Sequence, residues 1–296
     1  MNALKQRPIL TYILLAFGIT WSCWLPALWI AQREGLMLPF AANYAALAET
    51  GFQDRRHLLL SFVFAAAVYG PLIAAFVATR LQQGGGGARW LLRRMLRWNI
   101  GARWWGIMLA ISLLLLAVPV GIGLATGTLP AGGIQIAATS TLLAMFGAQL
   151  LTSGLGEEPG WRGFLWPQLQ ARYDAGKAVW LLGLIWAVWH YPFTIFFTLR
   201  GLAEAAPAEV AITLLLSLIG QTLSLIGITH IYVWLVNHTG SILLAIVFHA
   251  LGNTAVFVLV GGLGPAMEVV FALMPWLVVF VMERVVGKAW VSGEGA

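Results

Sequence analysis

Residues 178–199 read AVWLLGLIWAVWHYPFTIFFTL, a run of 22 residues without a charged side chain. An α-helix of about 20 mostly apolar residues is long enough to cross the roughly 30 Å hydrocarbon core of a bilayer. The run is apolar throughout, so it lacks the alternating pattern of a strand in a membrane barrel. It therefore predicts a transmembrane helix, and it places one ionisable side chain, His190, well inside that helix.

The remainder of the chain is also rich in apolar residues and poor in charged ones. Of its 296 residues, 60% are hydrophobic and 9% are charged, whereas charged residues make up about 25% of a typical soluble domain. We therefore expect an all-α, polytopic integral membrane protein with about eight transmembrane helices and a buried polar site. The expected spans are Ile9–Ile30, Leu58–Thr79, Trp104–Ala125, Ile136–Leu155, Ala178–Leu199, Val210–Val236, Ser241–Gly261 and Pro265–Val286.

Basic residues lie between these spans in a pattern that predicts their orientation. Residues 80–103, between the second and third spans, contain six arginines and no acidic residue, whereas the loops expected on the opposite side are balanced or uncharged. Loops rich in arginine and lysine stay on the cytoplasmic side, so we expect both termini in the cytoplasm, with the protein in a bacterial cytoplasmic membrane. This topology also explains the excess of 17 basic over 11 acidic residues, so we expect no nucleic-acid partner.

Two adjacent acids, Glu157 and Glu158, stand in the sequence GEEPGWRG at the end of the fourth span. A carboxylate at membrane depth costs several kcal/mol unless it has a partner or water. On a helix, Glu158 and Arg162 are four residues apart and can pair, while Glu157 points about 100° away and is free for another task. Pro159 should kink this helix or begin a new one. The alternative is a cytoplasmic loop with solvated charges.

Further polar residues lie inside two other spans. His190 is in the fifth span, and His249 and Asn253 are one helical turn apart in the seventh, so they share a face. Two hydrogen-bond donors directed at one point suit a developing oxyanion. Each residue alone has an alternative reading as a polar contact between packed helices. Because three different spans offer an acid, a base or a donor, we expect them to meet in one wet cavity.

Absent motifs narrow the class of function. The only aspartates, Asp54 and Asp174, fall in loops, which excludes an intramembrane protease with paired aspartates. The sequence contains no Gly-x-Ser-x-Gly, His-Glu-x-x-His, phosphate-binding or dinucleotide-binding motif. The single cysteine, Cys23, can form neither an intrachain disulfide nor a cysteine-based metal site.

Taken in order, the polar motifs resemble those of the CAAX-protease and bacteriocin-processing family, which includes the type II CaaX prenyl endopeptidases. The family pattern is Glu-Glu-x-x-x-Arg, then an aromatic-x-x-x-His, then His-x-x-x-Asn. The corresponding segments here are Glu157-Glu158-Pro-Gly-Trp-Arg162, Trp186-Ala-Val-Trp-His190 and His249-Ala-Leu-Gly-Asn253. Trp186 stands where the family often has Phe, and we expect that difference to be tolerated.

This resemblance implies an intramembrane endopeptidase that hydrolyses membrane-associated peptides or proteins. By the same resemblance, Glu157 and His190 would activate a water, His249 and Asn253 would stabilise the oxyanion, and Glu158 and Arg162 would hold the motif in place. We divide the chain accordingly into N-terminal helices with a basic loop (1–135), catalytic helices (136–260) and a C-terminal helix with its tail (261–296).

The cofactor and two rival functions stay open at this point. Glu157, His190 and His249 are the ligand types of catalytic zinc, so Zn²⁺ is a candidate cofactor, but a metal-free glutamate route needs the same residues. Two alternative functions are a non-catalytic immunity or scaffold protein of the same fold, and a proton-coupled transporter. A transporter more often shows repeated broken spans in matching halves, which this sequence lacks.

Overall fold

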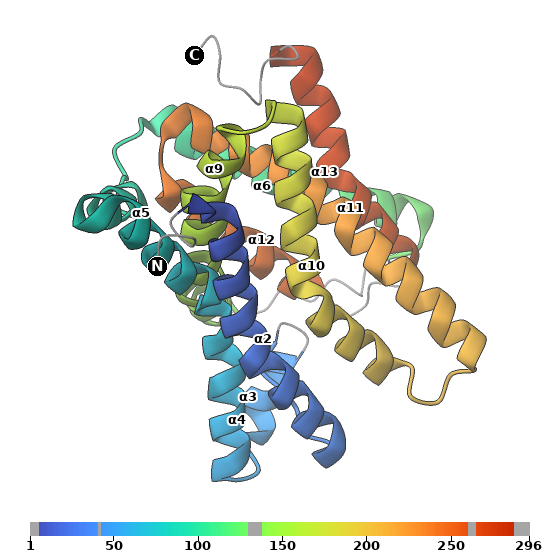
Figure 1. Cartoon of the computed structure of the whole chain (residues 1–296). Coiled ribbons are helices and arrows are strands. Elements are labelled where there is room, and N and C mark those ends of the chain that lie inside the picture. Colours follow the sequence, from blue (N-terminus) through green and yellow to red (C-terminus); the bar gives the residue numbers. More distant parts are fainter. Residues whose placement is uncertain (1–5, 41–42, 130–137, 260–264, 287–296) are drawn as a thin grey trace.

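The computed structural model describes residues 6–40, 43–129, 138–259 and 265–286, and all regular structure in these ranges is helical (Figure 1). The α-helices are α2 (Pro8–Glu34), α3 (Tyr44–Thr50), α4 (Arg55–Ala66), α5 (Gly70–Met95), α6 (Ala102–Thr126), α7 (Thr139–Gln149), α8 (Leu155–Glu158), α9 (Trp166–Gln170), α10 (Ala175–Gly201), α11 (Pro207–Thr239), α12 (Ile242–Leu259) and α13 (Pro265–Val286). A 3₁₀ turn, η2 (Ala67–Tyr69), joins α4 to α5.

The prediction of an all-α, polytopic membrane protein is confirmed for the described residues. Five helical stretches are long and apolar enough to cross a membrane, and a shorter apolar helix covers residues 242–255. The five stretches are Pro8–Glu34, Arg55–Met95, Ala102–Thr126, Ala175–Gly201 and Pro207–Thr239. Residues 136–137 of the expected fourth span, residues 260–261 of the seventh and the expected tail after Val286 lie outside the described residues.

The fourth span differs from a regular helix. From Thr139 to Gln170 the chain stays helical, but two π-helical stretches, η4 (Leu150–Gly154) and η5 (Pro159–Leu165), flank the single turn α8 that carries the two acids. Pro159 has no N–H, and its ring clashes with the carbonyl four residues earlier. The π-helical stretch η5 begins at Pro159, so a new helical element starts at the proline, and such π turns are frequent at functional sites.

Small residues let this irregular segment pack against its neighbours at backbone distance. A Cβ atom on Gly156 would lie 2.8 Å from the carbonyl oxygen of Val68 in η2, and one on Gly160 would lie 2.6 Å from that of Pro71 in α5. Neither distance is compatible with a real side chain. The glycines therefore allow the acid-bearing segment to lie directly against the α4–α5 junction, deep inside the helical bundle.

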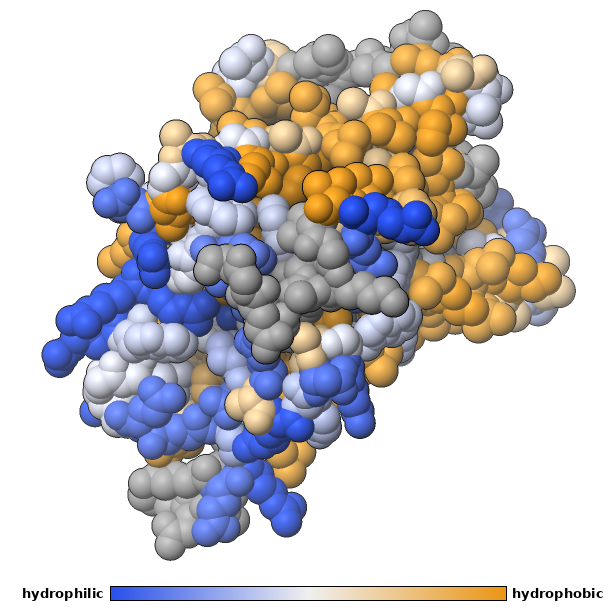
Figure 2. All heavy atoms as spheres, turned by 90° about the horizontal axis from the view of Figure 1, so that it is seen from above, coloured by the Kyte–Doolittle hydropathy of each residue, from blue (hydrophilic) through white to orange (hydrophobic). Residues whose placement is uncertain are grey.

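The surface of the molecule is divided between polar and apolar parts. Viewed from above, hydrophilic residues gather over one part of the face, while hydrophobic residues cover much of the remainder (Figure 2). Large apolar side chains on several helices are exposed, among them Leu14, Leu113, Leu216 and Val285. Exposed apolar surface on long helices is expected where the surrounding medium is lipid.

Candidate active site

The charged residues of the GEEPGWRG motif are buried. Glu157 is 2% exposed, and Glu158 and Arg162 are 0% exposed. The alternative of a solvated cytoplasmic loop is therefore wrong for this segment. Because burying an ionised group without partners is costly, the structure must supply partners for each of them.

Glu158 is the centre of the ion-pair network. Its Oε1 atom accepts a hydrogen bond from Arg162 Nη1 at 3.1 Å, which is the pair that the four-residue spacing predicts. The same oxygen accepts a second hydrogen bond from His249 Nδ1 at 2.7 Å. Glu158 therefore joins the acid-bearing segment to α12, a role that the sequence did not indicate.

The guanidinium of Arg162 is enclosed by residues from two other helices. It lies 4.0 Å from the ring centroid of Trp186 in α10 and 4.0 Å from that of Tyr232 in α11. Its Nη2 atom donates to the hydroxyl of Thr229 at 3.2 Å. Cation–π contacts of this kind strengthen when the cation is desolvated. Arg162 thus holds three elements of the bundle around Glu158.

Glu157 has a different set of partners. Its Oε2 atom accepts hydrogen bonds from two indole N–H groups, that of Trp186 at 2.7 Å and that of Trp161 at 3.3 Å. Hydrogen bonds to an ionised acceptor are roughly twice as strong as neutral ones. The second carboxylate oxygen, Oε1, accepts no hydrogen bond from the described residues. The two indoles therefore hold the carboxylate through one of its oxygens.

His190 is oriented by its own helix. Its Nδ1 atom lies 2.9 Å from the carbonyl oxygen of Trp186. Because a carbonyl only accepts, Nδ1 carries the proton, and in a neutral ring Nε2 is then an acceptor. The Trp186 ring lies 5.7 Å from the His190 ring and 5.9 Å from the His249 ring, measured between centroids. Glu157, His190 and His249 therefore border the same indole.

Asn253 lies one turn beyond His249 on α12, as the spacing predicts. Its side-chain amide donates to Gln149 Oε1 at 3.0 Å. Gln149 is the last residue of α7 and is 5% exposed. This hydrogen bond fixes the direction of the Asn253 amide and leaves its second N–H hydrogen for another acceptor.

The candidate metal ligands do not form a close group. In the described ranges, no three His, Cys, Asp or Glu side chains are placed to hold one metal ion. His249 Nδ1 is bonded to Glu158 and Glu157 Oε2 to two indoles, so these two atoms already have partners within the protein. Among the described residues, the three side chains expected from the sequence are therefore not gathered into a three-ligand group.

Comparison with known proteins gives a family match for part of the chain. Residues 137–255 match the family model described as type II CAAX prenyl endopeptidase Rce1-like. This segment is similar to the type II CAAX prenyl endopeptidases of that family. The range contains all six residues that the sequence motifs single out, so the resemblance noted from the sequence is confirmed.

A curated relative agrees with the family match. The chain is 35% identical over 105 residues to CAAX prenyl protease 2 of Methanococcus maripaludis. The aligned part is 35% of this chain and 36% of the relative, so the chain matches about a third of that protein's length. The name of this relative agrees with the description of the family model, and the similarity covers about a third of each chain.

Residues 137–255 also contain functional candidates that the sequence analysis did not single out. Trp161 and Trp186 both lie within the motifs: Trp161 is four residues after Glu157, a spacing that permits contact on a helix, whereas nothing indicated the bond from Trp186, 29 residues away. Gln149, Thr229 and Tyr232 lie outside the motifs, and a polar residue inside an apolar span was the only available signal. Such residues are common as ordinary helix-packing contacts, so that signal is weak.

Proposed function

We propose that this protein is an intramembrane endopeptidase that hydrolyses a peptide bond in a membrane-associated substrate. The family of residues 137–255 supports this class of activity. The observation that carries the proposal is the buried Glu157 carboxylate, held by two indoles through one oxygen and bordered by His190 and His249.

The balance of charge supports a donor role for His249. The buried network has two carboxylates, Glu157 and Glu158, against one guanidinium, Arg162. Two negative charges and one positive charge leave a net charge of minus one, and an unbalanced buried charge is costly. A protonated His249 brings the sum to zero. Its Nδ1–H then bonds Glu158, and its Nε2–H becomes a second donor.

In the proposed reaction, Glu157 Oε1 accepts a proton from a water as the water oxygen attacks the carbonyl carbon of the scissile bond. His190 Nε2 accepts the second hydrogen bond of that water and orients it. The carbonyl oxygen becomes an oxyanion, which His249 Nε2–H and the Asn253 amide stabilise. The C–N bond then breaks, and the proton held by Glu157 passes to the leaving amine.

The first experiment measures cleavage by purified protein in lipid nanodiscs. The name of the relative, CAAX prenyl protease 2, suggests the substrate pair: a fluorogenic peptide ending in a prenylated CaaX sequence, and the same peptide without the prenyl group. Glu157→Gln should lower the cleavage rate by about 10²–10⁴-fold. Glu209→Gln, at an exposed glutamate in the first turn of α11, is the matched control and should cleave normally.

One outcome of this cleavage assay would contradict the proposal. If Glu157→Gln and His249→Ala both retain wild-type cleavage while remaining folded, the enzyme proposal is wrong. Cleavage of the prenylated peptide alone supports a prenyl endopeptidase. Equal cleavage of both peptides supports an endopeptidase that does not require the lipid.

A further inference from the structure

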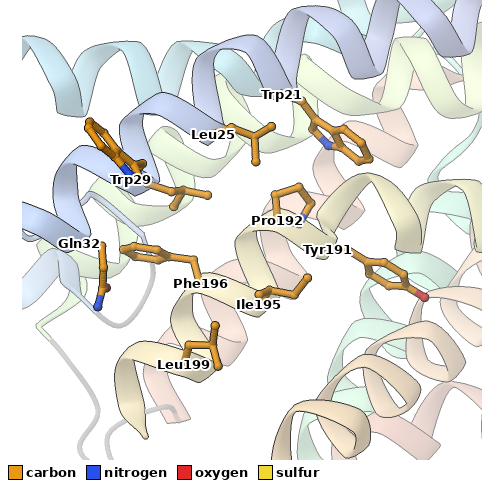
Figure 3. A pocket seen from close by; sticks show the side chains of 10 residues that line it. Trp21, Leu25, Trp29, Gln32, Tyr191, Pro192, Ile195, Phe196 and Leu199 are labelled. Atoms are coloured by element: carbon orange, nitrogen blue, oxygen red, sulfur yellow. The ribbon is translucent and has the colours of Figure 1, made fainter. Parts of the chain in front are cut away.

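An apolar groove lies between α2 and α10, on the part of α10 that follows His190. Figure 3 shows Leu25 and Trp29 on α2 facing Ile195 and Phe196 on α10, with open space between the two helices. The groove has a volume of about 460 Å³. Leu25 is 51% exposed and Trp29 is 59% exposed, so the groove opens to the surroundings of the bundle.

Two sets of polar contacts fix the helices at either end of this groove. At one end, the indole N–H of Trp21 donates to the carbonyl oxygen of Trp189 at 3.0 Å. At the other end, Arg200 donates to the carbonyl oxygens of Leu36 at 2.8 Å and Gly35 at 3.2 Å. The groove is therefore a fixed feature of the helix pair.

The length of the groove matches one leaflet of a bilayer. Its lining on α2 runs from Trp21 to Gln32, which is about 16 Å at a rise of about 1.5 Å per residue. One leaflet contributes about half of the roughly 30 Å hydrocarbon core. Gln32 is the polar member of the lining at the end near Arg200. This is the arrangement that a lipid requires, with an apolar chain along the wall and a polar group at the interface.

The polar end of the groove carries positive charge. The Arg33 guanidinium lies 4.5 Å from the centroid of the Trp29 ring, and that of Arg200 lies 5.9 Å from the centroid of the Phe196 ring. Both rings line the groove. The adjacent Glu34 is paired with Arg56 at 2.8 Å and so adds no uncompensated negative charge. An anionic headgroup at this end would meet two arginines.

From these observations we propose that the groove between α2 and α10 binds one anionic phospholipid, with an acyl chain along Leu25 and Ile195 and its phosphate at Arg33 and Arg200. The site is separate from the residues proposed for hydrolysis, and it does not depend on that activity. Ordinary anchoring of Trp29 and Arg33 at the interface is the competing explanation, and it requires no lipid selectivity.

The test uses full-length protein in nanodiscs made from equal parts of dioleoylphosphatidylglycerol and dioleoylphosphatidylcholine. Native mass spectrometry of the released protein then counts the retained lipids. Wild type should retain phosphatidylglycerol in preference to phosphatidylcholine. Arg33→Gln should lower this preference about fivefold, because one arginine near a lipid surface contributes about 1 kcal/mol.

Two controls distinguish a specific site from general effects. Arg284 is also an exposed arginine over an aromatic ring, 4.6 Å from the centroid of Phe280, and Arg284→Gln should retain the wild-type preference. Leu25→Trp fills the groove and should lower the number of retained lipids, whereas Leu113→Trp, at a 64% exposed position on α6, should not.

The proposal fails if wild type retains the two lipids in equal amounts. It also fails if Arg33→Gln and Arg284→Gln change the preference equally, or if Leu25→Trp retains as much phosphatidylglycerol as wild type. Circular dichroism of each variant checks that the helices are intact before lipids are counted.

Discussion

His249 donates its hydrogen bond to Glu158, at 2.7 Å, and not to the neighbouring Glu157. The two acids of the motif therefore have separate partners: Glu158 binds Arg162 and His249, and Glu157 binds two indoles. Glu158 joins charged side chains of two other elements through Oε1, whereas Glu157 is held by neutral indole N–H groups through Oε2. This separation predicts that substitutions at the two positions have different consequences.

Glu158→Gln should lower both stability and activity. Breaking a buried ion pair by removing one partner costs about 3–5 kcal/mol, because the other charge remains buried. Glu157→Gln should keep a melting temperature close to wild type, because the amide oxygen can still accept the two indole hydrogen bonds, while cleavage falls. Differential scanning fluorimetry in detergent, together with the cleavage assay, measures both effects. Equal melting temperatures for the two variants would contradict the separation of roles.

Trp186→Phe should lower the cleavage rate with little loss of stability. Phenylalanine keeps an aromatic face for Arg162 but removes the 2.7 Å hydrogen bond to Glu157. A hydrogen bond to a charged group contributes about 1.5–3 kcal/mol, so a loss of at least about tenfold in kcat is expected. Trp186→Ala also removes the cation–π contact and should lower the melting temperature as well. A Trp186→Phe enzyme with wild-type kcat would show that this bond has no part in positioning Glu157.

Gly156→Ala should destabilise the protein. The new Cβ would lie 2.8 Å from both the carbonyl oxygen and the Cγ1 atom of Val68, and overpacking typically costs about 1–3 kcal/mol. The control is Gly106→Ala in α6, where a Cβ would have no neighbour within 4 Å. That substitution should be neutral or slightly stabilising. Thermal unfolding of both variants provides the measurement. An unchanged melting temperature for Gly156→Ala would contradict the prediction, because it would mean that the α4–α5 junction moves to accommodate the new methyl group at little cost.

Removal of metal should leave cleavage intact. The arrangement of Glu157, His190 and His249 does not form a three-ligand group, so incubation with a strong chelator is expected to leave the rate unchanged. Elemental analysis of purified protein gives an independent measurement. One zinc per chain in wild type, lost in His190→Ala, would support the zinc route instead.

The sequence predicts the helical spans and the contacts within one helix, but not the contacts between helices. The pairing of Glu158 with Arg162 follows from spacing alone. The partner of Glu157 in α10 is 29 residues away, and that of Glu158 in α12 is 91 residues away. The helix that each acid faces depends on how α8 is rotated about its own axis, and the π-helical stretches on either side of α8 change that rotation. No periodicity in the sequence marks where a helix widens.

The π-helical stretch η4, immediately before α8, makes the position of both carboxylates depend on chain length. A π turn accommodates one residue more than an α turn. Deleting one residue from Leu150–Gly154 would restore a regular α-helix. The side chains of Glu157 and Glu158 would then be rotated by about 100° around the helix axis. The acids would then face helices that offer neither the indoles nor the imidazole, and no exchange of side chains elsewhere would return them. The site is thus encoded in the number of residues that precede it as well as in their identity.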